Sequence, residues 1–215
     1  MTDSANSYRQ EVSRISKIKY FIQQSWLLLV AAFCFGLLIA VASAAWSPKI
    51  EQNKIDKLNR LMQQLLPNAK SFPLETQLTI KSAKGTNIDT DLYKALSDAN
   101  ECIGWAFNAS GPGFQDKIEL VVAVDRNFKR FAGFAVLTSN ETPGFGDQIK
   151  LPYYQGQYKK APVTNLELVK AGDDKKIDAE IVAISGVTVS SEAVIKIINN
   201  TARQVKEQMK EKGIL

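Results

Sequence analysis

The chain has no histidine among its 215 residues. This absence excludes a serine–histidine or cysteine–histidine nucleophile pair, a histidine-ligated haem and a histidine-rich zinc site. Neither a Gly-x-x-x-x-Gly-Lys loop nor a Gly-x-Gly-x-x-Gly fingerprint occurs. We therefore expect no catalytic residue and no metal site, and any chemistry would come from a bound cofactor.

The chain also has few cysteines and no strong excess of charge of one sign. Of the 2 cysteines, Cys34 lies in an apolar segment, which leaves Cys102 without a disulfide partner in the polar part of the chain. Cys102 is interpreted as a small buried apolar residue. The net charge is +5, but acidic residues are mixed with the basic ones and form no basic stripe. A nucleic-acid partner is therefore not expected.

One long apolar run is present. Residues 26–46 carry no charged side chain, and Trp26 and Trp46 stand at its two ends. A helix of about 20 apolar residues crosses a bilayer, and tryptophan favours the membrane interface. The sequence predicts a single-pass transmembrane helix over 26–46. Ala42-Ser43-Ala44 also fits a signal-peptide cleavage site, but the run is longer than a usual signal core.

The flanking charges give a weaker signal for orientation. Arg14, Lys17 and Lys19 precede the span, and Lys49 and Lys54 follow it. Long C-terminal domains are exported largely regardless of charge. We expect residues 1–25 in the cytoplasm and the remainder on the outer, periplasmic side of the inner membrane.

An amphipathic connecting helix is predicted over 47–70, because its apolar residues follow helical spacing until Pro67 ends it. It either packs on the following domain or forms a stalk that docks on partner subunits. Residues 71–215 are predicted to form an α+β domain. Its expected elements are strands over 74–80, 102–108, 117–125, 131–138, 166–170 and 177–184, a short helix over 89–98, and a long C-terminal helix.

The sharpest local feature is the corner between the last strand and the last helix, residues 184–191. Gly186 permits a tight turn, and Ser190 or Ser191 is predicted to cap the helix, with Glu192 in its first turn. The Thr188 hydroxyl is then expected beside free N–H groups and a positive helix end, a corner that suits a phosphate. An ordinary capped turn explains the same residues.

This corner, Ser185-Gly186-Val187-Thr188-Val189-Ser190, resembles the Ser/Thr-Gly-Ala-Thr-x-Thr/Ser motif of a bacterial FMN-binding domain family. That domain occurs in the G subunit of the Rnf complex and the C subunit of the sodium-pumping NADH:quinone reductase. The resemblance implies that FMN is bound covalently to Thr188 through a phosphoester. The family has Ala at position 187 and Asp at position 182, where this chain has valine at both.

Two further stretches are similar to the family in order and spacing. Gly111-Pro112-Gly113-Phe114 resembles its Gly-x-Gly-Tyr segment, and Glu141-Thr142-Pro143-Gly144-Phe145-Gly146 resembles its Glu-Thr-Pro-Gly-Leu-Gly loop. Pro143-Gly144 predicts a type II turn. The resemblance implies cofactor contacts from Ser185, Gly186, Glu141, Thr142, Gly144, Phe145 and Gly146, and from Gly113 and Phe114.

The resemblance implies a membrane-anchored flavoprotein subunit of an Rnf-type electron-transport complex, with other membrane subunits and the lipid bilayer as partners. Such a subunit is an electron carrier and not a stand-alone enzyme. Two alternatives stay open: a flavin-free assembly subunit, since Val182 and Val187 depart from the motif, and a tethered flavoenzyme that acts on a small substrate.

Overall fold

The computed structural model of the protein describes residues 3–82 and 85–215. The chain divides into two compact units, Met1–Lys54 and Ile55–Leu215, and each is described by itself.

The first unit is helical. Helix α1 spans Asp3–Leu65, so it continues into the second unit, and it contains Pro48. Within the described part of the chain, α1 is the one helix that is long and apolar enough to cross a membrane. Its large apolar side chains between Trp26 and Trp46 are exposed, as a lipid-facing helix requires. The predicted N-terminal apolar helix is confirmed. The basic side chains before residue 20, which carry the orientation prediction, lie outside the described side chains.

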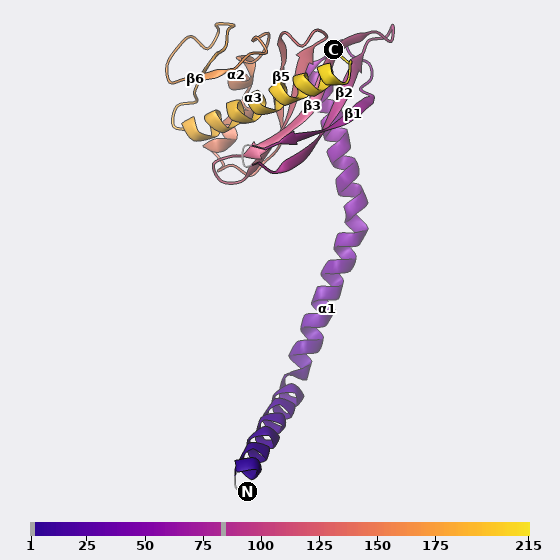
Figure 1. The fold of residues 1–215 in the computed structure, drawn as a ribbon, viewed down its shortest axis with the longest axis vertical. Coiled ribbons are helices and arrows are strands. Elements are labelled where there is room, and N and C mark those ends of the chain that lie inside the picture. Colours follow the sequence, from indigo (N-terminus) through magenta and orange to yellow (C-terminus); the bar gives the residue numbers. More distant parts are fainter. Residues whose placement is uncertain (1–2, 83–84) are drawn as a thin grey trace. The chain divides into compact units, whose positions relative to one another are not determined.

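The second unit is built on a five-stranded antiparallel sheet in the order β1-β2-β3-β4-β5 (Figure 1). Its strands are β1 (Leu74–Lys81), β2 (Asn87–Leu96), β3 (Cys102–Pro112), β4 (Lys117–Asp125) and β5 (Phe131–Ser139). The predicted strands within β1, β3, β4 and β5 are confirmed, and β4 and β5 form the expected hairpin. With helices before and after the sheet, the predicted α+β class is confirmed.

The predicted short helix over 89–98 is wrong. This segment is strand β2, and it pairs with β1 on one side and β3 on the other. Leu92 and Ala95 are fully buried on opposite faces of the sheet. The helix-favouring residues of this segment are outweighed by hydrogen bonds on both strand edges and by burial on both faces.

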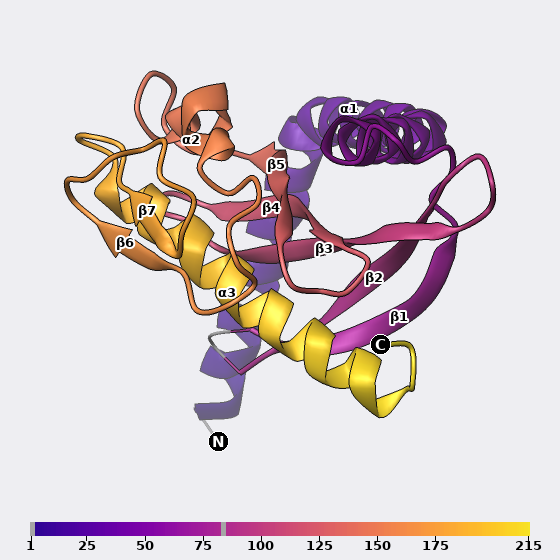
Figure 2. The ribbon, with the colours of Figure 1, turned by 90° about the horizontal axis from the view of Figure 1, so that it is seen from above.

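Two helical segments cover the two faces of the sheet (Figure 2). Helix α3 (Thr188–Glu211) packs Val194, Ile198 and Val205 against one face. The end of α1 packs Leu58 and Met62 against the other. Small residues on that face, such as Ala106 and Ala123, let the α1 backbone come close. The connecting-helix segment after Ile55 therefore packs on the domain.

The segment between β5 and α3 holds short elements: η1 (Gly146–Lys150), α2 (Pro152–Gly156), β6 (Glu167–Val169) and β7 (Glu180–Val182). β6 and β7 pair in parallel, so both predicted strands exist but are shorter than expected. The buried Gln157 side chain accepts from the Val182 N–H and donates to its carbonyl, at 2.7 and 3.2 Å. This pairing replaces a further strand beside β7.

Side chains of α3 cover the outer edge of β1. Gln204 exchanges hydrogen bonds with the Lys81 backbone, and Gln208 donates to the Thr79 carbonyl at 2.8 Å. Asn200 and Lys212 extend the same row to Lys81 and Gln77. An open strand edge invites pairing with another chain, and these side chains occupy it.

Candidate functional site

Three segments singled out in the sequence meet at the side chain of Glu141, which is 4% exposed. Its Oε1 accepts hydrogen bonds from the backbone N–H groups of Phe114 and Gln115, at 2.9 and 3.1 Å. Its Oε2 accepts one from the Ser190 hydroxyl at 2.5 Å. One carboxylate thus joins the loop after β3, the loop after β5 and the first turn of α3.

Two glycines make room for this carboxylate. A Cβ added at Gly113 would lie 2.3 Å from Oε1 of Glu141, and one added at Gly146 would lie 2.7 Å from the Glu141 Cβ. No side chain fits at such distances. Of the four glycines in the predicted cofactor set, Gly113 and Gly146 are therefore required for the close approach of the backbone to Glu141.

The Pro143-Gly144 segment forms the type II turn that the sequence predicts. Gly144 has a φ of 78°, and the Phe145 N–H donates to the Thr142 carbonyl at 3.1 Å. The turn holds Phe145 out from the surface, where it is 64% exposed.

Further bonds connect the two loops. The Thr142 hydroxyl donates to the Gln115 side chain at 3.0 Å, and the Asn140 amide donates to Asp116 at 2.8 Å. Asp116 also accepts a hydrogen bond from the Lys117 backbone N–H. The bond from Asn140 and then this backbone bond lower the pKa of the Asp116 carboxyl, because both stabilise its charged form. Both loops are therefore held in one arrangement by side chains near their tips.

The corner before α3 turns as expected, but its capping differs. Gly186 has a φ of 77°, and α3 begins at Thr188 with no side-chain cap. The prediction that Ser190 or Ser191 caps the helix is wrong, because both lie in its first turn and are buried. Ser190 bonds to Glu141, and Ser191 accepts from the Ile184 N–H. Glu192 lies beyond the first turn.

Thr188, the first residue of α3, is exposed. Ser185 and Gly186, which precede the helix, are also exposed. Large apolar side chains are exposed on the same segments: Phe114 at 68%, Phe145 at 64% and Val189 at 54%. A cavity of about 230 Å³ lies between the Ser110–Gly113 stretch and α3, with Val189 in its wall. Thr188 therefore starts a helix turn that Glu141 joins to two loops with exposed aromatic side chains, and a cavity lies beside Val189. This arrangement fits a ligand with a phosphate end and a planar ring.

The comparisons with known proteins agree with this geometry. The FMN-binding domain family matches residues 113–203, a range that contains all the segments that meet at Glu141. The G subunit of the proton-translocating ferredoxin:NAD(+) oxidoreductase complex of Clostridium ljungdahlii is 30% identical over 83% of this chain and 88% of its own length. The chain belongs to the G-subunit family of these complexes.

Other members and relatives extend the match. The G subunit of the ion-translocating oxidoreductase complex of Methanosarcina acetivorans is 26% identical over 84% of this chain and 92% of its own length. The crystal structure of NqrC from Shewanella oneidensis superposes with a TM-score of 0.55 and 25% identity, over 67% of this chain and 72% of that chain. The predicted family is confirmed.

Within the predicted cofactor set, the structure brings Glu141 into contact with Gly113, Phe114 and Gly146. Ser190 connects Glu141 to the helix turn that begins with Thr188. Glu141 and Gly146 are buried, Gly113 is half-buried, and the remaining candidates are exposed. Sequence reasoning missed the roles of Ser190, Gln115, Asp116 and Asn140. The available signal was weak, because serine near a helix start and polar residues in a hairpin loop have ordinary local explanations.

Proposed function

We propose that the protein is a membrane-anchored electron-carrier subunit of an Rnf-type complex and holds FMN by a phosphoester on Thr188. One observation supports this most directly: Thr188 is exposed at the start of α3, and Ser190 of the same turn is bonded to Glu141 between the two glycine loops. When bound, FMN supplies the redox chemistry by taking up and giving up electrons.

The first turn of α3 would hold the phosphate end. In the transfer, Thr188 Oγ1 would lose its proton and bond to the phosphorus of an activated flavin phosphate, and the phosphorus would release the leaving group of that donor. The free N–H groups of the turn and the positive helix end favour the negative charge that remains on the phosphoester. Gly186, with its positive φ, turns the chain so that the Thr188 hydroxyl faces solvent, where a flavin-transferring enzyme reaches it.

Exposed apolar side chains would cover the ring. Phe114 and Phe145 offer flat faces that otherwise cost free energy by standing in water, and Val189 adds an aliphatic surface next to the attachment point. Thr142 and Gly144 lie in the same loop, three positions and one position before Phe145, and would offer the ring a hydroxyl and a backbone group.

Glu141 would act by position and not by touching the ring. Both of its oxygens already accept hydrogen bonds from protein donors, and its side chain is buried. Its function in this proposal is to fix the distance between the attachment point and the aromatic side chains.

Denaturing gel electrophoresis under ultraviolet light tests the proposal. The full chain is produced together with a flavin-transferring enzyme, and we expect a fluorescent band. Thr188→Ala loses the band, and Thr164→Ala, which removes an exposed hydroxyl elsewhere, keeps it. A dark band from the parent chain contradicts covalent attachment.

A flavin-free assembly subunit is the second candidate, and Val182 is the observation that favours it. The family has Asp at this position. Here the residue is valine, and the Gln157 side chain bonds to both its backbone N–H and its backbone carbonyl. A chain that remains colourless after production with the transferring enzyme, and yet is needed for its complex to assemble, supports this second candidate.

A further inference from the structure

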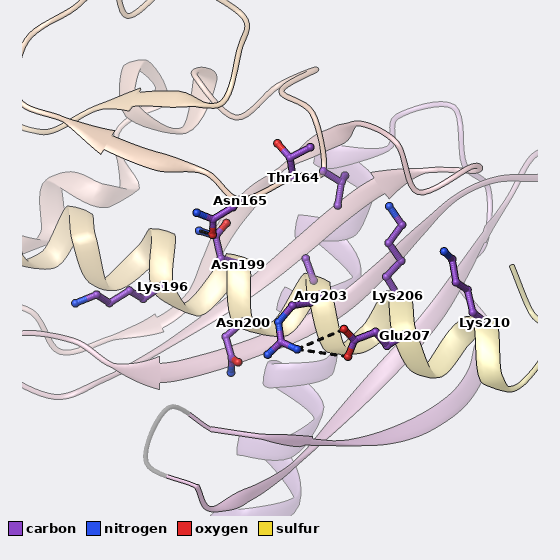
Figure 3. A pocket seen from close by; sticks show the side chains of 11 residues that line it. Thr164, Asn165, Lys196, Asn199, Asn200, Arg203, Lys206, Glu207 and Lys210 are labelled. Atoms are coloured by element: carbon purple, nitrogen blue, oxygen red, sulfur yellow. Dashed lines mark hydrogen bonds and ion pairs between the residues drawn. The ribbon is translucent and has the colours of Figure 1, made fainter.

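A groove of about 730 Å³ follows the outward side of α3 (Figure 3). Its far wall comes from the Val163–Asn165 stretch before β6, and Val163 and Ala202 give it an apolar floor. The G-subunit family resemblance assigns no role to this part of the chain.

Basic side chains dominate the groove. Lys196, Arg203, Lys206 and Lys210 line it, and Glu207 is the acidic residue in its lining. Glu192 pairs with Lys196 at 2.7 Å, and Glu207 pairs with Arg203 at 3.4 Å. Figure 3 shows the Lys206 and Lys210 side chains extending from the same side of α3. Lys206 lies over the Phe128 ring at 5.8 Å. Two of the four cations, Lys206 and Lys210, therefore have no carboxylate partner among the described residues.

The groove adjoins the candidate cofactor site. Lys196 and Asn200 line it and also line the smaller cavity beside Gly111, Gly113 and Val189. A molecule that fills the groove therefore has one end at that cavity.

We propose that this groove is the docking site for an acidic segment of a partner redox protein, with an apolar side chain that enters between Val163 and Ala202. Charge complementarity selects the occupant, because a row of cations, two of them without a carboxylate partner in the described part of the chain, attracts carboxylates. The apolar floor in a concave groove favours a peptide segment over a lipid surface, which needs projecting cations on a flat or convex face. That the partner exchanges electrons rests on the proposed function, whereas the docking itself does not.

A labelled peptide tests the docking. The probe is a fluorescein-labelled polyglutamate peptide with one central leucine, and its fluorescence anisotropy is measured with the full chain in detergent at low and high salt. We expect saturable binding that weakens with salt, and weaker binding when serine replaces the leucine. Lys206→Glu with Lys210→Glu is expected to weaken binding about tenfold or more.

Lys170→Glu with Lys175→Glu is the matched control, since both residues are exposed, lie outside the groove lining and change the net charge equally. We expect this control to bind within about twofold of the parent. Equal weakening in the two double variants overturns the proposal, because net charge then explains binding. Binding to vesicles of anionic lipid but not to the peptide also overturns it.

Repeating the measurement with Thr188→Ala separates the two proposals. Unchanged peptide binding by this variant supports docking independent of the flavin. Loss of peptide binding in this variant overturns the assignment to the groove, whatever the flavin content of the parent.

Discussion

The Glu141 carboxylate is buried, and each of its oxygens accepts a hydrogen bond from a protein donor. A buried carboxylate is costly unless donors of this kind surround it, so the three donors must be held in place as firmly as Glu141 itself. The geometry of the loops is therefore linked to that of the first turn of α3 through one side chain.

Gly113→Ala tests this arrangement at a single residue. The added methyl group would meet Glu141 and the Asp116 carbonyl at 2.3 and 2.7 Å, so the loop must shift. We expect a loss of about 1–3 kcal/mol in the free energy of unfolding, measured by urea titration, with reduced flavin loading. Gly156→Ala is the control, because nothing lies within 4 Å of its added Cβ. Equal stability of the two variants contradicts the tight packing at Glu141.

At this scale the sequence predicted local turns but not the contacts between distant residues. The Pro143-Gly144 turn was predictable because it depends on neighbouring residues. The bonds of Glu141 to Phe114, Gln115 and Ser190 join residues 27, 26 and 49 positions apart. No local pattern encodes such contacts, and serine near a helix start indicates a cap, which is why the sequence wrongly predicts a cap at Ser190 or Ser191.

At the scale of the elements, two buried tyrosines hold the start of α3. Tyr154 lies in α2, and Tyr158 follows the end of α2. The Tyr154 and Tyr158 hydroxyls are 2.8 Å apart, and Tyr154 donates to the Ser191 carbonyl at 3.1 Å. Burial raises the pKa of Tyr154 to about 12 and raises the pKa of Tyr158 well above its usual value of 10.0. Both hydroxyls are therefore neutral in the folded protein until strongly alkaline pH.

This pair predicts alkaline instability. A group whose pKa is raised on folding contributes stability that is complete below its unfolded pKa and is lost as pH rises through the folded pKa. We expect the free energy of unfolding in urea to fall from about pH 10, by on the order of 2 kcal/mol at pH 12. Tyr158→Phe is expected to reduce this fall, and Tyr153→Phe, at an exposed position, to leave it unchanged. The same fall in both variants contradicts the assignment.

The covered edge of β1 gives a second prediction for α3. Replacing Gln204 and Gln208 together by leucine leaves the Lys81 and Thr79 carbonyls without these donors. We expect a loss of about 1–3 kcal/mol in unfolding free energy and more self-association in size-exclusion chromatography. Glu211→Leu places one leucine at an exposed position of the same helix and is expected to stay monodisperse. Association in the control alone contradicts the role of the edge.

Element by element, the sequence predicted the strands with clear alternation and the apolar face of α3. It failed at β2, where partners on both edges override the preference of the segment, and at the bounds of β6 and β7. These failures share one cause, since strand pairing is decided by segments that lie elsewhere in the chain.

At the scale of the whole molecule, the N-terminal apolar helix anchors the protein to a membrane, and the α+β domain carries the candidate site. The apolar run alone predicted the anchor. The sequence leaves open whether the helical segment after the apolar run packs on the domain or stands as a stalk. Leu58 and Met62 are buried, so the last turns of α1 pack on the domain.

The side of the membrane that the domain occupies remains a prediction, and a single cysteine tests it. In a Cys34→Ala, Cys102→Ala background, Lys175→Cys places one thiol on an exposed loop. Because we expect the domain on the outer side, a membrane-impermeant maleimide is expected to label it in intact cells. Labelling that requires cell lysis reverses the orientation.

Intact-protein mass spectrometry of the full chain, followed by peptide mapping, tests the central claim most directly. We predict a mass increment equal to one FMN less one water, located on the peptide that contains Thr188 and lost in Thr188→Ala. An unmodified mass from a chain produced together with a flavin-transferring enzyme, or an increment on any other peptide, would contradict covalent attachment at Thr188.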